Sequence, residues 1–539
     1  MNKKLVGLIV VFACFAMIFT VFSGYIEGKR VKKGTELIIG TPYEPDTLDV
    51  QKTTWVVESA SIVYENLVQY DLNGKLKPGL AESWEISEDG KIITFHLREG
   101  IKFANGDPLT AEDVKYTIDR MLDPETKCPT TFMLGPIKSV KVIDNLTFQM
   151  IFKEPYAPIW APLAETYVGI IDKDFIEKVG DTKYGETPMA AGPYYVIKWV
   201  RGNCIEYVKN PHYKGIYRPD YENEGAPYID KIKLRIIPET LTLISELKAG
   251  NVQLIDTVPP EYYKKLQDNP KITVIPSMAQ GITYLGFNCM KPPLDDVRVR
   301  QAIAMAVNRD PIIEDLLQGM GVATYGPLPP TIPGYSEEMD NYAKEKYLYD
   351  IEEAKALLSK AGWEDRDEDG VVDKDGKPLK LQLWNSMNWP QHQKIATVLQ
   401  QQLAKIGVKI EVRTYEDAYM RSELAKGTQE LFLWQYGWAD PWILNIMFHS
   451  EAAKGAERMF FHTEELDEML IEANSLMNFT KRAAVLKEIQ KYLIDGCPWV
   501  PLFTELSVYA YRNDMVEGIK VNPYAGGELL LGDTERISG

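Results

Sequence analysis

The residues with the clearest chemical potential form an acidic run in the second half of the chain. Asp365, Asp367, Asp369 and Asp373 occupy positions 1, 3, 5 and 9 of a D-x-D-x-D-G pattern, and position 12 is Gly376. Calcium loops present oxygen ligands with this spacing, but they end in a bidentate glutamate at the twelfth position. The pattern therefore favours a solvated hairpin before the next strand. A calcium site at the four aspartates is the alternative, and no cofactor is required.

Aromatic side chains form a second group with binding potential. Trp384 ends an expected strand and is followed by Asn385, while Trp434, Trp438 and Trp442 recur four residues apart. Indole faces at strand ends can line a pocket by stacking on ligand groups, although a single tryptophan more often belongs to a core. We expect several of these side chains to reach a binding surface.

The sequence contains no local motif of an enzyme. It has no Gly-x-x-x-x-Gly-Lys loop, no His-Glu-x-x-His pair and no Gly-x-Ser-x-Gly elbow, and its five histidines are scattered. The net charge of −17 would repel a polyphosphate backbone, so nucleic-acid binding is not expected. An enzyme would need a non-local site that the sequence does not reveal, which leaves an exported hydrolase as a distant alternative.

Two kinds of element must position these residues. Short strands and hairpins dominate the first half, whereas helices such as 296–307, 391–406 and 481–495 alternate with strands such as 380–384 and 409–414 later in the chain. The last forty residues return to strands. This order predicts an α/β protein with two lobes, between which the chain crosses more than once.

The N-terminus has the pattern of an export segment. Lys3 and Lys4 precede an unbroken apolar run of 18 residues from Leu5 to Phe22. As a helix this run would span about 27 Å, so residues 1–28 are either a cleaved signal or a membrane anchor. Lipid attachment at Cys14 is the second option. We expect an extracytoplasmic body, in the periplasm or at the cell surface, that is tethered to the membrane or secreted.

Four cysteines remain in that body. Cys128, Cys204, Cys289 and Cys497 could form two disulfides in an oxidising compartment, in any of three pairings. The sequence does not choose between these pairings.

Several ordered segments resemble the family 5 extracellular solute-binding proteins of ABC importers, the peptide- and nickel-binding group. These segments are 80–90, 94–103, 105–114, 225–232, 292–303, 308–310, 361–363 and 498–502. The first three form one signature of about 35 residues. The resemblance extends over nearly all of the chain after the export segment.

The resemblance implies a bilobal fold like that of periplasmic binding proteins, of type II, with a hinge and an extra N-terminal subdomain. Residues 34–72, 188–288 and 500–539 would form the first lobe, 73–187 the extra subdomain and 289–499 the second lobe. The two crossings between the lobes would lie at 284–288 and 499–503.

The resemblance also implies a function. The chain would be a monomeric receptor that captures oligopeptides between its lobes and delivers them to the transmembrane subunits of an ABC permease, which work with their ATPases. It would perform no chemistry itself. An oligosaccharide-binding receptor of the same family is the alternative.

Two acidic positions acquire roles from the resemblance. Asp440, beside Trp438, lies in a segment similar to one in which an aspartate pairs with the peptide α-ammonium. The segment is shorter here because Pro441 follows at once, and a turn before this proline is the other interpretation of Asp440. Glu44 matches an acidic position that faces the ligand main chain, and a solvated loop carboxylate is its other interpretation. With Trp384 and Asn385, these residues are the expected ligand contacts.

Overall fold

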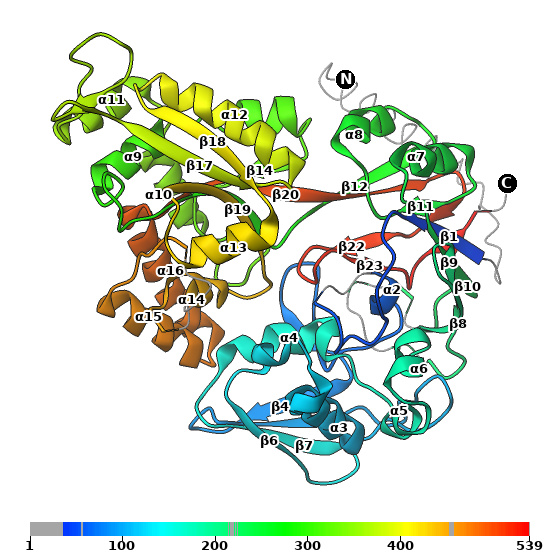
Figure 1. The fold of residues 1–539 in the computed structure, drawn as a ribbon. Helices are drawn as coiled ribbons and strands as arrows, with labels where there is room; N and C mark the ends of the chain where they lie inside the picture. Colours follow the sequence, from blue (N-terminus) through cyan, green and yellow to red (C-terminus); the bar gives the residue numbers. More distant parts are fainter. Residues whose placement is uncertain are drawn as a thin grey trace, which may run out of the picture.

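The computed structural model describes residues 36–54, 58–213, 215, 220, 222–223, 225–451 and 458–537. The expected signal or anchor, residues 1–28, lies outside the described residues. Among the helices of the described part, none is both long enough and apolar enough to cross a membrane. The ribbon shows two lobes joined by strands, with a small domain beside them (Figure 1).

A mixed sheet of twelve strands runs through both lobes. Its order is β18 (Lys409–Tyr415), β17 (Lys380–Ser386), β19 (Leu431–Gly437), β13 (Gly281–Phe287), β20 (Trp499–Arg512), β11 (Leu254–Ile255), β1 (Glu36–Thr41), β10 (Lys231–Ile236), β9 (Cys204–Lys209) and β8 (Tyr194–Val200), with β12 (Ile272–Met278) and β14 (Gly321–Ala323) also paired to β20. β1 runs parallel to β10 and β11, and β17 runs parallel to β18 and β19. Parallel neighbours require crossover connections, which explains the helices between these strands.

Two strand segments join the lobes. The first part of β20 pairs with β13, and its second part pairs with β12 from Met278↔Leu506 to Ile272↔Arg512. Only Ala279 and Gln280 separate β12 from β13. The strands therefore change partners at 279–280 and near 504–506, not at the expected 284–288 and 499–503. The difference arises because β20 continues through the junction, while β12 ends and β13 begins on either side of Ala279 and Gln280.

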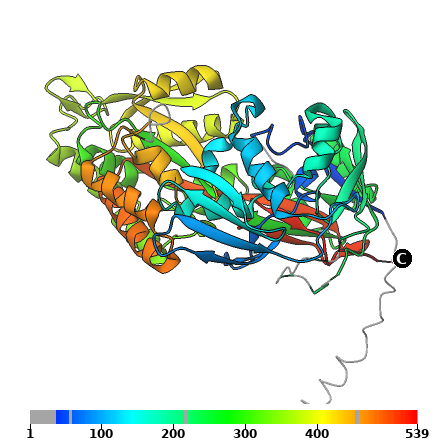
Figure 2. The ribbon, with the colours of Figure 1, turned by 90° about the horizontal axis from the view of Figure 1, so that it is seen from below.

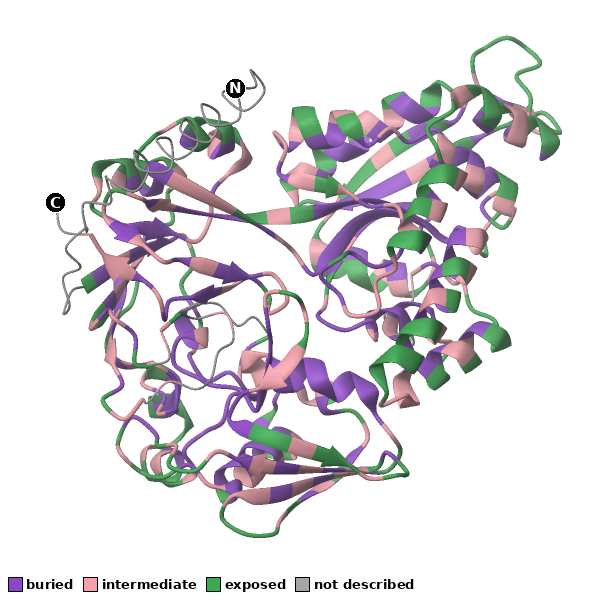
Figure 3. Ribbon diagram, turned by 180° about the vertical axis from the view of Figure 1, so that it is seen from behind, coloured by how far each residue is buried: buried purple, intermediate pink, exposed green. Residues whose placement is uncertain are grey.

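The burial of β20 marks the junction. Its residues are buried from Trp499 to Thr504, exposed or half-buried from Glu505 to Ser507, and mostly buried again beyond Ser507. Figure 3 shows the same loss of burial along the strands that bridge the two lobes. The bridging segment thus lies between two cores, and its Leu506 packs half-buried against the core that contains Leu243 and Val508.

The first lobe is built around β1 and β8–β12. Its core contains Leu37, Tyr64, Tyr184, Tyr194 and Tyr207, all of which are buried. Its other elements are α2 (Glu58–Ser61), α5 (Lys173–Val179), α6 (Asp181–Glu186), α7 (Thr240–Ala249), α8 (Pro260–Gln267), and the paired strands β21 (Val516–Glu517) with β24 (Glu535–Arg536), and β22 (Lys520–Asn522) with β23 (Glu528–Leu530). The paired strands β2 (Val68–Tyr70) and β3 (Leu76–Pro78) pack instead against the core of the small domain.

The small domain has its own antiparallel sheet within residues 81–152 and its own core, to which residues from Leu67 to Ala191 contribute. The strand order is β4 (Ala81–Ile86), β5 (Ile92–Leu97), β7 (Thr147–Phe152) and β6 (Ile137–Val142), and the helices are α3 (Ala111–Leu122), α4 (Trp160–Ala164), and the short 3-10 helices η1 (Pro124–Thr126), η2 (Thr131–Leu134), η3 (Ala157–Ile159) and η4 (Thr166–Val168). Phe95 stacks on Phe148 in its core, with ring centroids 5.1 Å apart. Seen from below, this domain lies across the junction of the lobes (Figure 2).

The second lobe has helices on both faces of its sheet. In β19, Leu431 and Leu433 belong to one core, whereas Phe432 and Trp434 belong to the core on the other face. A strand buried on both faces has an almost continuous apolar sequence. The remaining elements are α9 (Val297–Met305), η5 (Pro311–Leu316), α10 (Glu337–Lys346), α11 (Ile351–Lys360), β15 (Asp373–Lys374), β16 (Lys377–Pro378), α12 (Pro390–Ala404), α13 (Asp417–Ala425), α14 (Ile443–Phe448), α15 (Glu464–Ser475) and α16 (Phe479–Gly496).

All four cysteines of the body are free thiols. Cys128 lies in the small domain and Cys204 in the first lobe, while Cys289 and Cys497 lie in the second lobe. The two disulfides that the sequence allows are therefore not formed in this structure.

Candidate functional site

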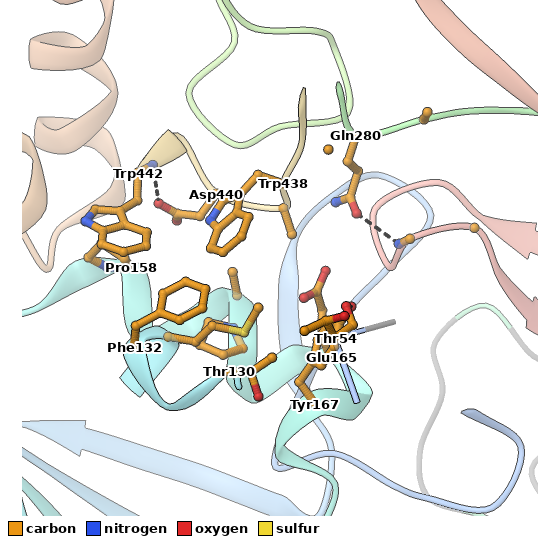
Figure 4. Close-up of a pocket in the computed structure, with 18 of the residues that line it drawn as sticks. Thr54, Thr130, Phe132, Pro158, Glu165, Tyr167, Gln280, Trp438, Asp440 and Trp442 are labelled. Carbon is orange, nitrogen blue, oxygen red and sulfur yellow. Dashed lines mark hydrogen bonds between the residues drawn. The ribbon is translucent and has the colours of Figure 1, made fainter. Parts of the chain in front are cut away.

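A cavity of about 430 Å³ lies where the small domain, the bridging strands and the second lobe meet. This volume is within the range of small-molecule sites. Figure 4 shows its two main walls: residues of the small domain on one side, and the loop after β19 on the other. Ser277 to Gln280 and Ser507, from the bridging strands, complete it.

Gln280 forms hydrogen bonds that connect the bridging segment to residues of both lobes. Its backbone carbonyl accepts a hydrogen bond from the N–H of Trp438 at 2.7 Å, in the second lobe. Its side-chain oxygen accepts from the N–H of Gly526 at 2.9 Å (Figure 4). Its Nε2 donates to the carbonyl of Tyr524 at 3.1 Å. Both of these partners lie in the turn between β22 and β23. A change in the angle between the lobes must therefore act on this residue.

Aromatic rings from both walls meet in the cavity. The Phe132 ring of η2 stacks on Trp438 and Trp442, with ring centroids 5.6 and 6.1 Å apart. Tyr156 meets Trp442 edge to face at 6.4 Å. Phe132 keeps 48% of its surface exposed although it is surrounded by rings, so it offers an apolar face inside the cavity. Such contacts contribute about 0.5–1.5 kcal/mol each beyond the burial of area.

Asp440 lines the cavity, but its charge is compensated from within the protein. Arg482 of α16 donates two hydrogen bonds to it, Nη1 to Oδ2 at 2.8 Å and Nη2 to Oδ1 at 2.6 Å. The backbone N–H of Trp442 adds a third at 2.8 Å. Both side chains of the ion pair are buried. A buried bidentate pair of this kind holds the loop before α14 in place.

Glu165 is the second carboxylate in the cavity and has no such partner. It follows α4, and its side chain points from the small-domain wall towards the cavity (Figure 4). Burial raises the pKa of Glu165 to about 7, and the negative charge of Asp440 adds to this effect. At neutral pH the group is thus poised between its acid form and its anionic form.

The other expected ligand residues do not line this cavity. Trp199 Nε1 and the N–H of Gly202 each donate to the Glu44 carboxylate at 3.0 Å. Trp384 is buried against Tyr415, and the amide of the buried Asn385 donates to the carbonyl of Arg413 at 3.2 Å. Of the five expected contacts, the structure thus brings only Trp438 and Asp440 together at the cavity.

Asp365, Asp367 and Asp369 lie in an exposed loop, and Asp373 is the half-buried first residue of β15. Oxygens of Asp365, Asp367 and Asp369 lie within 4.8 Å of one another, and Asp373 is not part of this group. Asp365 accepts from the N–H of Gly370 at 3.1 Å. This hydrogen bond is typical of a turn within the loop. Calcium binding at these aspartates stays a prediction.

Glu165 and Phe132 were not anticipated from the sequence. Glu165 does carry a local signal, because it is the first charged residue after the apolar stretch from Tyr156 to Ala164. A lone carboxylate at the end of a buried helix is a candidate for a site. Phe132 carries no such signal, since its partners lie about 300 residues further along the chain.

Comparisons with known proteins agree with this architecture. The family model described as bacterial extracellular solute-binding proteins, family 5 Middle, matches residues 75–455. Heme-binding protein A of Haemophilus influenzae is 30% identical over 491 residues, covering 86% of both chains. The probable D,D-dipeptide-binding periplasmic protein of Escherichia coli is 29% identical over 505 residues, covering 90% of this chain and 92% of the relative.

A solved structure has the same fold. It is a periplasmic binding protein of Helicobacter pylori in complex with the peptide STSA, which is 24% identical to this chain with a TM-score of 0.71. The match covers 94% of this chain and 99% of that one.

Proposed function

This chain belongs to the bacterial extracellular solute-binding proteins of family 5, and we propose that it captures oligopeptides in the cavity between its lobes for an ABC importer. The observation that supports this most is the cavity itself, which joins an aromatic wall to an uncompensated carboxylate. A peptide offers apolar side chains for the first and an ammonium group for the second.

Capture would work through the two bridging strands. A ligand that contacts both walls is bound more tightly by the closed form than by the open form, and so it shifts the population towards closure. The closed receptor then docks on the transmembrane subunits of the permease and releases the ligand to them. The proposal assigns no bond-making or bond-breaking step to the chain.

We also propose where the chain is located and which residues contact the ligand. The N-terminal segment would export the chain and either leave it anchored or release it as a monomer outside the cytoplasm. Trp438 and Asp440 would contact the ligand directly. Glu44, Trp384 and Asn385 stay predicted contacts for parts of a longer ligand outside the cavity.

An oligosaccharide is the second candidate ligand, because stacked aromatic rings also bind sugar faces. A thermal-shift screen with di- to pentapeptides and with β-linked oligosaccharides separates the two. We expect peptides to raise the melting temperature and to change tryptophan emission, and Trp438→Ala to abolish both effects. The matched control is Trp363→Ala, because Trp363 packs on the other core of the second lobe. A response to oligosaccharides alone would overturn the peptide assignment.

A further inference from the structure

We infer that Glu165 makes the cavity selective for ligands that bring a positive charge into it and selective against ligands that bring a carboxylate. The inference rests on the proposed function and specifies its substrate class. The preferred ligands are peptides whose amino terminus or basic side chain enters the cavity while their carboxyl terminus stays outside it or is blocked. The charges of the two cavity walls determine this selectivity.

The carboxylate of Glu165 is uncompensated among the described residues. Its backbone N–H and carbonyl are used in local turns with Pro162 and Val168, but its side chain makes no hydrogen bond or ion pair to the described part of the chain. Glu165 is half-buried, and a carboxylate that is partly removed from water without a partner is less stable as an anion. A ligand is therefore the natural source of the missing positive charge.

No cation of the cavity wall can take that role. The described residues that line the cavity include no lysine, arginine or histidine. The guanidinium beside Asp440 belongs to Arg482, which gives two hydrogen bonds to Asp440 and a third, from Nε, to the carbonyl of Ala473 at 3.0 Å. Since this pair is neutral overall, Glu165 alone sets the net charge of the described walls.

The groups that face Glu165 strengthen this bias. Asp440 faces it from the loop after β19, and Tyr70 lies near it in β2. Tyr156 and Tyr167 belong to the same wall as Glu165. The Asp440 carboxylate raises the pKa of Glu165, whereas a cationic ligand would lower it again. A ligand carboxylate in the cavity would meet two acidic groups and no basic one.

The aromatic wall opposite supplies the apolar part of the recognition. Trp438 and Trp442 lie on the wall opposite Glu165, and Phe132, from the same wall as Glu165, stacks on them (Figure 4). An ammonium group held at Glu165 would place the side chain next to it within reach of these rings, whose faces also attract cations. The carboxylate of Glu165 and the aromatic rings would thus both bind the amino-terminal end of a peptide.

The test uses the full chain and three versions of one tri- to pentapeptide library. The versions have free termini, an amidated carboxyl terminus or an acetylated amino terminus, and retained peptides are identified by mass spectrometry. Affinities of individual retained peptides are then measured by titration calorimetry in all three forms. The variant is Glu165→Gln, which removes the charge and keeps the shape. Its control is Glu99→Gln, an exposed carboxylate of the small domain that does not line the cavity.

We expect amidated peptides to bind at least as tightly as free acids, and acetylated peptides without a basic side chain to lose about tenfold or more in affinity. Glu165→Gln should cause the same loss for peptides with a free amino terminus and no loss for acetylated ones, while Glu99→Gln changes neither. Loss of binding on amidation, or unchanged affinity of Glu165→Gln, would overturn the inference and leave the proposed function standing. Failure of every library to bind would overturn both.

Discussion

At the scale of single residues, the two carboxylates of the cavity differ in whether a described residue compensates their charge. Asp440 could be selected from the sequence because a motif surrounds it. Its partner Arg482 could not, because the two residues are 42 positions apart and meet only when α16 packs against the loop after β19. The ion pair changes the expected role of Asp440, since its charge is compensated before any ligand arrives. Glu165 is therefore the cavity carboxylate whose charge no described residue compensates.

The first prediction concerns this ion pair. Asp440→Ala leaves the buried guanidinium of Arg482 without its counter-charge, so the free energy of unfolding should fall by about 3–5 kcal/mol. Urea unfolding of the wild type and the variant measures the difference. The double variant Asp440→Leu/Arg482→Leu should lose less than Asp440→Ala, because no uncompensated charge remains. A loss below about 1 kcal/mol in Asp440→Ala, as for an exposed pair, would contradict this account.

The second prediction follows from the pKa of Glu165. In the folded protein this pKa is raised from 4.5 to about 7, so the folded state holds the proton more tightly than the unfolded chain does. Stability due to this group is therefore present at low pH and is lost as the pH rises from 4.5 through 7. The Glu165→Gln variant does not lose stability in this way, because glutamine does not titrate. The stability of the variant relative to the wild type should increase by about 2 kcal/mol between pH 5 and pH 8. If the free energies of unfolding of Glu165→Gln and the wild type differed by the same amount at every pH in this range, the raised pKa of Glu165 would be refuted.

At the scale of elements, the bridging strands explain what the sequence could and could not reveal. The sequence predicts strands over the last forty residues, and β20 (Trp499–Arg512) is the first strand of this part of the chain. The place where the strand changes partners was not recognised, because backbone pairing continues through it. Only the polar residues Glu505 and Ser507 mark the junction, and single polar residues of this kind are common in edge strands.

The third prediction tests whether the side-chain hydrogen bonds of Gln280 restrain the two lobes. Gln280→Ala removes the two side-chain hydrogen bonds to the turn between β22 and β23, at about 0.5–1.5 kcal/mol each. The lobes should then open more readily, which would increase the radius of gyration in small-angle scattering without ligand. Gln393→Ala, at an exposed position of α12, is the control. Equal radii for both variants would show that Gln280 does not restrain the lobes.

The fourth prediction concerns the contact of the small domain with the second lobe. Phe132→Ala removes the ring that stacks on Trp438 and Trp442, which exposes these indoles and weakens the closed form. We expect a red shift of tryptophan emission and a loss of peptide affinity of about tenfold. Ile143→Ala, another exposed apolar side chain of the small domain, should show neither effect. An unchanged emission spectrum for Phe132→Ala would argue against this stacking in solution.

At the scale of the whole molecule, the family and the bilobal α/β fold predicted from the sequence are confirmed. Ordered local segments carry this information, because they record backbone turns and core positions that the fold requires. The cavity could be predicted only in part. Trp438 and Asp440 belong to one such segment, whereas Phe132 and Glu165 reach the cavity through the packing of the small domain, which no local pattern encodes.

The most direct test of the account is to fill the cavity and measure peptide binding by calorimetry. Gly437 lines the cavity, and a Cβ placed there would meet no atom within 4 Å. Gly437→Phe should therefore occupy the ligand space without straining the fold. We predict that the wild type binds one peptide per chain, that Gly437→Phe binds none, and that both unfold at similar temperatures. Equal peptide affinity in the folded variant would contradict the claim that this cavity is the binding site.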